Sequence, residues 1–205
     1  MGIFFEREKE KTMKLMEERI MRDGNVLPGG ILKVGNFLNQ QIDPMLLKEI
    51  GEEIARLFEN EGVTKILTIE SSGIAIGAAA AMAMGVPMIF AKKHKTSNVD
   101  GYVYSTIVHS FTHGIDYDVF VSCDYLNEGE KVLIVDDFLA NGNAIMGLLD
   151  LVEQAEAESV GVAVCIEKEF QGGGEIIRNK GIRLESLAIV SELGEGRIKL
   201  REQDA

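Results

Sequence analysis

Short apolar runs alternate with helix-like segments along most of the chain. The runs are rich in β-branched residues and bounded by charged or turn-forming ones, which is typical of strands buried on both faces of a parallel sheet. They lie at 65–70, 87–91, 132–135 and 159–166. Helices are expected between them, from 44 to about 62, at 74–84 and from 145 to about 156. This order predicts an α/β fold whose doubly wound, mostly parallel central sheet is flanked by helices on both faces.

Smaller elements are expected at both ends of this core. Residues 5–22 mix Glu, Lys and Arg with apolar residues, which indicates a solvated amphipathic helix. Residues 31–37 alternate apolar and polar positions, as a short strand or an extended segment does. The other expected elements are an antiparallel pair of strands at 104–110 and 118–123, a short helix at 172–181, and closing strands at 186–190 and 197–200. A chain of 205 residues that is 46% apolar can bury one full core, so one domain is expected.

Two carboxylates, Asp136 and Asp137, stand where the strand at 132–135 is expected to end. Small and turn-forming residues follow, and a helix begins within a few positions. Unpaired N–H groups of such a loop and of a first helical turn favour an anion such as phosphate, while neighbouring carboxylates suit hydroxyls or a metal. A phosphorylated ribose offers both kinds of group. The alternative is that the two acids only cap a turn before the helix.

A second junction of this kind follows the strand at 65–70. Glu70 leads into Ser71, Ser72 and Gly73, after which an Ala-rich helix begins. Because parallel strands present their carboxyl ends at one edge of a sheet, both junctions are expected to face the same ligand. Two loops suited to anions fit a ligand with phosphates at both ends. The alternative for this junction is an ordinary capped helix start.

The compact basic run of this acidic chain is KKHK, which supplies Lys92, Lys93 and Lys95. The polar segment 96–104 behind it is expected to be mobile and, with these lysines, to close over a polyphosphate and exclude water. The alternative is a solvated charged face. The three histidines lack metal-ligand spacing, so no zinc site is expected.

Charge and composition narrow the range of partners. The net charge of −12 is spread along the sequence, which argues against a broad contact with a nucleic-acid backbone. Charged residues at 6–9 interrupt the start before a signal peptide forms, and Gly85 and Pro87 break the uncharged stretch 74–91, so no membrane span is expected. Cys123 and Cys165 lie far apart and form no CxxC pair, so buried free thiols in a cytoplasmic protein are expected.

The segment VLIVDDFLANGNA resembles the phosphoribosyl pyrophosphate (PRPP) signature of type I phosphoribosyltransferases. The segments ILKVGNFLNQQIDP, KILTIESSGIAIG, FAKKHK and VCIEKEFQ, in this order, are similar to the bacterial members that act on xanthine. The resemblance spans about residues 13–200. It implies a single domain over 13–205 with a small hood formed by about 26–42 and the C-terminal segment, and it leaves residues 1–12 as an N-terminal extension that the family does not explain.

The resemblance implies a reaction in which xanthine and PRPP give xanthosine 5′-monophosphate and pyrophosphate, with substrate-bound Mg²⁺ and in a homodimer. Asp136 and Asp137 would be the catalytic acids that face the ribose hydroxyls. The residues that would bind PRPP are Ala140, Asn141, Gly142, Asn143 and Ala144 at the 5′-phosphate, and Glu70, Ser71, Ser72, Gly73, Lys92, Lys93 and Lys95 at the pyrophosphate. The residues that would bind the base are Leu32, Asn39, Phe138 and Lys168. Asn141 and Ala144 stand where the family often has threonine, which shifts phosphate binding toward backbone amides.

The sequence leaves two other functions open. A lysine that donates to the 6-oxo group of a purine does not distinguish xanthine from guanine or hypoxanthine, which share that oxygen. A PRPP-sensing transcription regulator could reuse the same fold, but it would need a nucleic-acid-binding unit, and this acidic chain offers only a short charged N-terminal helix.

Overall fold

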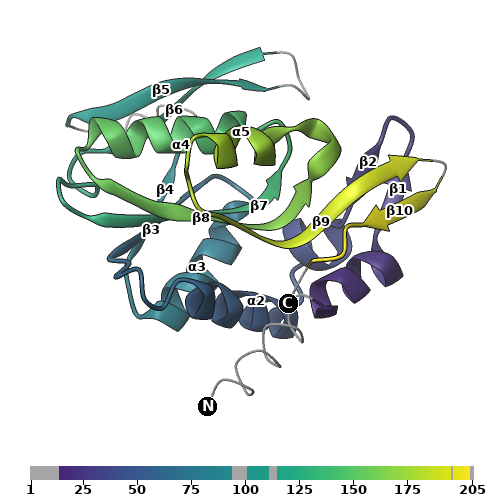
Figure 1. Cartoon of the computed structure of the whole chain (residues 1–205). Helices are drawn as coiled ribbons and strands as arrows, with labels where there is room; N and C mark the ends of the chain where they lie inside the picture. Colours follow the sequence, from purple (N-terminus) through teal and green to yellow (C-terminus); the bar gives the residue numbers. More distant parts are fainter. Residues whose placement is uncertain (1–13, 94–100, 111–114, 195, 204–205) are drawn as a thin grey trace.

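A six-stranded sheet forms the centre of the computed structural model, which describes residues 14–93, 101–110, 115–194 and 196–203 (Figure 1). Its strand order is β10-β9-β8-β7-β3-β4, and all neighbours are parallel except the β10–β9 pair. The strands are β3 (Lys65–Ile69), β4 (Met88–Ala91), β7 (Lys131–Leu139), β8 (Glu158–Lys168), β9 (Leu184–Gly194) and β10 (Arg197–Leu200). The predicted doubly wound, mostly parallel sheet is confirmed.

Helices cover both faces of the sheet. The helices α2 (Pro44–Leu57) and α3 (Gly73–Met84) lie below it in Figure 1, and α4 (Asn143–Gln154) and α5 (Gly173–Asn179) lie above it. Strand β7 shows why both faces must be covered, because Leu133 and Val135 belong to one core cluster and Val132 and Ile134 to the other. All four are fully buried, as the apolar run predicted.

Two hairpins and an N-terminal helical segment complete the fold. Residues 14–23 are helical, and the rest of the predicted helix at 5–22 lies outside the described residues, as does the extension 1–12. The hairpin of β1 (Asn25–Leu27) and β2 (Ile31–Lys33) follows. The second hairpin pairs β5 (Val103–Ser110) with β6 (Ile115–Ser122) in the predicted antiparallel manner. The first hairpin lies beside β9 and β10 on the right of Figure 1.

Two predicted boundaries are wrong in ways that affect the site. Strand β7 does not end at 135 but continues through the two aspartates to Leu139, because the longer strand β8 pairs with it there (Asp136 with Val164, Phe138 with Ile166). The segment expected to extend over 31–37 leaves the strand at Lys33 and forms a π-helix, η1 (Gly35–Asn39). Such short π-turns recur at functional sites.

Other differences are smaller. The helix expected to reach 62 ends at Leu57, and the closing strand expected at 186–190 extends over the whole of β9 because β10 folds back on it as a hairpin. Cys165 is buried as predicted, whereas Cys123 is only partly buried, and both are free thiols. Within the part of the chain that the structure describes, no helix combines the length and the apolarity needed to cross a bilayer.

Candidate functional site

Two buried carboxylates lie side by side near the carboxyl end of β7. Asp136 is 5% exposed and Asp137 is 7% exposed, and the backbone N–H of Asp137 donates to Oδ1 of Asp136 over 2.9 Å. Burial raises the pKa of Asp136 well above its usual value, the neighbouring charge of Asp137 raises it further, and Lys93 partly opposes the shift. We call these residues the acid pair. Buried carboxylates of this kind suit a ligand that brings hydroxyl donors or a cation.

The β3–α3 junction (residues 70–73) lies beside the acid pair, because β3 pairs directly with β7. A Cβ built on Gly73 would lie 2.8 Å from Oδ1 of Asp136, and closer still to the Thr68 hydroxyl. Only glycine therefore lets α3 begin this close to the acid pair. The Glu70–Ser71 peptide bond is cis, and the Glu70 carboxylate accepts a hydrogen bond from the backbone N–H of Lys93.

The β7–α4 junction (residues 140–144) emerges at the same edge of the sheet. Gly142 has a φ of 88° and directly precedes α4, and no side chain caps the helix at this position. Asn141 Oδ1 accepts from the backbone N–H of Asn143 over 3.2 Å, which closes the turn. The first helical turn therefore presents backbone amides at the junction, the arrangement that binds phosphate groups at helix N-termini. The sequence prediction that both junctions share one edge is confirmed.

Gly173 supports this junction from α5 and was not identified from the sequence. Its backbone N–H donates to the carbonyl of Ala140 over 3.1 Å, and a Cβ built on it would lie 2.4 Å from that oxygen. The residues Gly172, Gly173 and Gly174 predicted only the start of a short helix. The close approach explains why a residue without a side chain stands at the second of these positions.

Three of the predicted base-binding residues surround Asp137. Asn39, at the end of η1, donates from Nδ2 to Oδ2 of Asp137 over 3.0 Å, across 98 residues of sequence. Lys168 Nζ lies 5.2 Å from the ring centre of Phe138 on the neighbouring strand. Burial lowers the pKa of Lys168, and the charge of Asp137 opposes that shift. Leu32, in β2, is 5% exposed and belongs to the core cluster against which Phe138 packs.

The lysines of the basic run have different surroundings in the structure. Lys92 exchanges two backbone hydrogen bonds with Phe120, of 2.9 and 3.1 Å, and so links the end of β4 to β6. Lys93 Nζ lies 5.1 Å from the ring centre of Tyr117. Lys95 and residues 96–100 lie outside the described residues, so the predicted closing segment stays a prediction.

Tyr117 is a residue of this site that the sequence did not indicate. It lies in β6, and burial raises the pKa of its hydroxyl, with a further contribution from the charge of Asp136. The phenol therefore lies within electrostatic reach of the acid pair and under Lys93. Alternation along β6 predicted a strand, but nothing in that pattern shows which of its side chains meets a residue from β7.

Glu167 fixes the end of β8, one residue before Lys168. Its carboxylate is 1% exposed and accepts two hydrogen bonds from Arg178, of 2.8 and 2.7 Å, and one of 2.6 Å from the Ser186 hydroxyl. Burial alone would raise the pKa of Glu167, but these hydrogen bonds outweigh it and the pKa is lowered. Three elements, β8, α5 and β9, are joined at this carboxylate.

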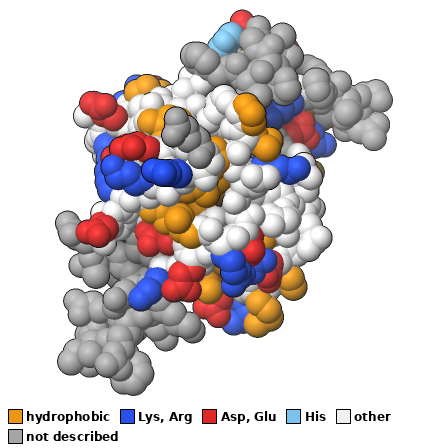
Figure 2. Space-filling view, turned by 90° about the vertical axis from the view of Figure 1, so that its right-hand side faces the viewer, with side chains coloured by type: hydrophobic (Ala, Val, Ile, Leu, Met, Phe, Trp, Pro, Cys, Tyr) orange, Lys and Arg blue, Asp and Glu red, His pale blue; other side chains and the backbone are white. Residues whose placement is uncertain are grey.

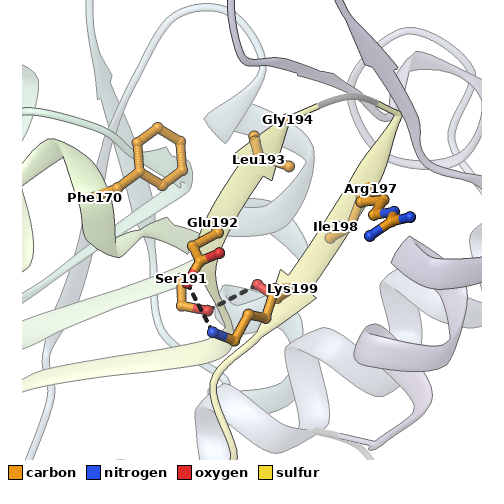
Figure 3. A pocket seen from close by; sticks show the side chains of 8 residues that line it. All are labelled: Phe170, Ser191, Glu192, Leu193, Gly194, Arg197, Ile198 and Lys199. Carbon is orange, nitrogen blue, oxygen red and sulfur yellow. Dashed lines mark hydrogen bonds and ion pairs between the residues drawn. The ribbon is translucent and has the colours of Figure 1, made fainter.

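A pocket of about 610 Å³ lies at the β9–β10 hairpin, and none of the predicted site residues lines it. In Figure 3, Phe170 stands across from the hairpin, while Ser191 donates to the carbonyl of Lys199 over 3.1 Å and Lys199 pairs with Glu192 over 2.7 Å. Figure 2 views the molecule from this side and shows hydrophobic side chains gathered near the middle of the face, with Lys and Arg side chains around them.

Comparison with known proteins agrees with this geometry. A model of the phosphoribosyl transferase domain matches residues 39–176. The xanthine phosphoribosyltransferase of Clostridium novyi (strain NT) is 53% identical over 186 residues, which cover 91% of this chain and 98% of the relative. The enzyme of that name from Clostridioides difficile (strain 630) is 51% identical over 190 residues, which cover 92% of this chain and 100% of the relative.

Solved structures share the fold at lower identity. The adenine phosphoribosyl transferase of Trypanosoma brucei, in complex with AMP, pyrophosphate and ribose-5-phosphate, superposes with a TM-score of 0.74 at 18% identity, covering 88% of this chain and 81% of that one. The two junctions at one sheet edge, the buried acid pair and the domain match over most of the chain agree with one another. The chain belongs to the phosphoribosyltransferase family and has its type I fold.

Proposed function

We propose that this chain transfers the 5-phosphoribosyl group of PRPP to xanthine and releases pyrophosphate, which forms xanthosine 5′-monophosphate for purine salvage. The observation that carries the proposal is the buried acid pair, which lies between two anion-suited junctions on one side and Asn39, Phe138 and Lys168 on the other. A donor with two phosphate-bearing ends and a flat purine acceptor fit this arrangement.

The donor is held from its two ends. Backbone amides of the β7–α4 junction bind the 5′-phosphate, and the acid pair accepts hydrogen bonds from the ribose hydroxyls. The β3–α3 junction and Lys93 face the pyrophosphate, because Glu70 binds the backbone of Lys93 and fixes it beside that junction. The positions of the residues and the family resemblance support these roles.

Charge separation dominates the chemistry. As the bond from ribose to pyrophosphate breaks, positive charge develops on the ring and negative charge on the leaving group. The acid pair faces the developing cation, and the lysine next to the β3–α3 junction faces the developing anion. Exclusion of water by the buried surroundings strengthens both interactions.

The residues present fit Mg²⁺ held chiefly by substrate oxygens. This ion is usually bound by one or two carboxylates together with phosphate oxygens and water. The acid pair would supply the carboxylates and the substrate the remaining oxygens, and among the described residues no group of three His, Cys, Asp or Glu side chains could hold a metal by itself. Bound with PRPP, the ion would neutralise charge on the departing pyrophosphate.

The base is chosen by residues outside the two junctions. Lys168 is a donor only, so it favours a 6-oxo purine over adenine, whose exocyclic amino group is also a donor. The two relatives described above match this chain over 98% and 100% of their own length, and both are named for xanthine. Their names support the 2,6-dioxo purine as acceptor. The hydrogen bond of Asn39 to Asp137 and the burial of Leu32 support a role of the hood segment, about 26–42, at this end of the site.

The active form is a homodimer in the cytoplasm. Helix α3 carries no charged residue, yet its Met82 is 76% exposed, and Phe90 in the adjoining edge strand β4 is 37% exposed. An apolar patch that reaches solvent at the carboxyl end of α3 and on the edge strand β4 is best covered by a second copy of the chain. Light scattering after gel filtration tests this assembly: twice the chain mass supports it, and the mass of one chain contradicts it.

Steady-state turnover with PRPP and Mg²⁺ tests the function. Xanthine should give the largest kcat/KM among xanthine, guanine, hypoxanthine and adenine. Equal efficiency with hypoxanthine would reject the xanthine assignment and leave a broader purine phosphoribosyltransferase. PRPP binding without turnover of any base would indicate a sensor instead of an enzyme.

A further inference from the structure

Arg19 joins three segments that surround the π-helix η1. Its guanidinium lies 5.1 Å from the ring centre of Phe37, which is in η1 and only 1% exposed. The guanidinium also pairs with Asp23, at the end of its own helix, over 2.7 Å, and with Asp43, at the start of α2, over 2.9 Å. The Arg19 side chain itself is only 23% exposed, so these contacts are partly shielded from water.

The contacts of Arg19 close a ring of interactions around the π-helix. The backbone N–H of Asp43 donates to the carbonyl of Phe37 over 2.9 Å, while Oδ1 of Asp43 caps α2 through the N–H groups of Met45 and Leu46. Asn36, also in η1, donates to the carbonyl of Asp23 over 3.2 Å. Both the start and the middle of η1 are therefore tied to the helical segment 14–23 and to the N-terminus of α2.

The π-helix ends at Asn39, whose amide holds Asp137. Residues 14–38 precede the matched domain, which begins at 39, so Arg19 and Phe37 lie outside that domain, while Asp43 lies inside it. A π-helix of five residues has few hydrogen bonds of its own to fix its geometry. Its position therefore depends on contacts with neighbouring segments. A shift of η1 moves Asn39 relative to Lys168 and leaves the two phosphate junctions in place, since those rest on the sheet.

We propose that Arg19 is a positioning residue for base recognition: by stacking on Phe37 and pairing with Asp43, it sets where Asn39 meets the purine, although it touches neither substrate. The inference rests on the proposed function, because it assigns Asn39 to the base end of the site. It predicts that loss of Arg19 affects the acceptor much more than the donor, which Asn39 reaches only through its hydrogen bond to Asp137.

Arg183 provides a matched control. Its guanidinium lies 4.5 Å from the ring centre of Phe58 and pairs with Glu61 over 2.6 Å and with Glu185 over 2.9 Å, so it repeats the stacking and ion pairs of Arg19. It lies just before β9, at the amino end of the parallel strands, whereas the junctions follow the carboxyl ends of β3 and β7. Its replacement should lower stability in the same manner without reaching the site.

The test measures kcat, KM for xanthine at saturating PRPP, KM for PRPP at saturating xanthine, and melting temperature. Arg19→Met should raise KM for xanthine about tenfold and keep KM for PRPP within about twofold, whereas Arg183→Met should lower the melting temperature and change neither KM. Arg19→Lys, which keeps the charge but not the planar group, should recover part of the xanthine KM.

Asp43→Asn keeps the fold testable should Arg19→Met be unstable. Asparagine caps helices as well as aspartate does, so α2 stays capped while one of the two carboxylates that pair with Arg19 loses its charge. It should raise KM for xanthine about threefold and spare KM for PRPP. Equal increases in both KM values, an unchanged xanthine KM, or a similar xanthine effect in Arg183→Met would overturn the inference. Failure of the unaltered protein to use any base would instead reject the proposed function.

Discussion

Replacing Asp136 by Asn removes one of two carboxylates that the fold buries in contact. Burial raises the pKa of Asp136, and the charge of Asp137 raises it further. The fold of the ligand-free protein therefore destabilises the ionised form of Asp136. Asn has nearly the same shape and can still accept the 2.9 Å hydrogen bond from the Asp137 N–H. The substitution should therefore stabilise the ligand-free protein at neutral pH.

The gain should be about 2 kcal/mol, the order of the cost of burying an incompletely compensated polar group. For a chain of this size, this corresponds to a rise of roughly 4–8 °C in melting temperature. Its pH dependence has a definite sign. A raised folded-state pKa destabilises the native protein above that pKa, and the penalty disappears as pH falls through it toward the ordinary value of 3.8. The advantage of Asp136→Asn should thus be largest near pH 8 and shrink as the solution is acidified.

Thermal unfolding of the ligand-free protein at pH 8 and pH 5 checks this, with Asp124→Asn as the control. Asp124 is exposed, so its replacement should change stability by no more than about 0.5 kcal/mol at either pH. The stabilised Asp136→Asn protein should also lose most of its kcat, because the carboxylate that faces the ribose is gone. A destabilised Asp136→Asn protein at pH 8, or a gain independent of pH, would refute the reasoning.

Three further outcomes are expected. Lys168→Met should raise KM for xanthine about 10- to 100-fold, the worth of a charge-assisted hydrogen bond, and leave PRPP binding measured by calorimetry nearly unchanged; equal loss of both would contradict its role. Glu167→Gln should cost about 2–3 kcal/mol at pH 7 in urea unfolding, because it breaks the buried pair with Arg178. Since the pKa of Glu167 is lowered, that deficit should shrink as pH falls from the ordinary value of 4.5 through the lowered pKa, and a deficit that persists in acid would show that packing rather than charge is responsible. Gly173→Ala should weaken PRPP binding at least tenfold, because its Cβ would collide with the Ala140 carbonyl; unchanged binding would show that the β7–α4 junction tolerates the shift.

Much of the fold follows from the apolar runs. A strand buried on both faces must be apolar at successive positions, and this pattern located β3, β4, β7 and β8 to within a few residues. The two junctions were predictable for the same reason, because small residues and acids at the ends of parallel strands meet at one edge. The acid pair was therefore recognisable from the sequence alone.

Contacts between distant segments could not be predicted in this way. Tyr117 meets Lys93 because a hairpin folds over the sheet edge, and Gly173 meets Ala140 because α5 begins against a loop 33 residues earlier in the chain. The π-helix of the hood has no periodic signature in five residues, and an alternating pattern predicted an extended segment there. In each case the decisive contact joins residues from separate elements.

The most direct test of the central claim is product analysis of a reaction that contains only the unaltered protein, xanthine, PRPP and Mg²⁺. The account predicts xanthosine 5′-monophosphate and pyrophosphate in equal amounts, and their loss in an Asp136→Asn, Asp137→Asn double variant that remains folded. PRPP consumption without the nucleotide, or undiminished nucleotide formation by the double variant, would contradict it.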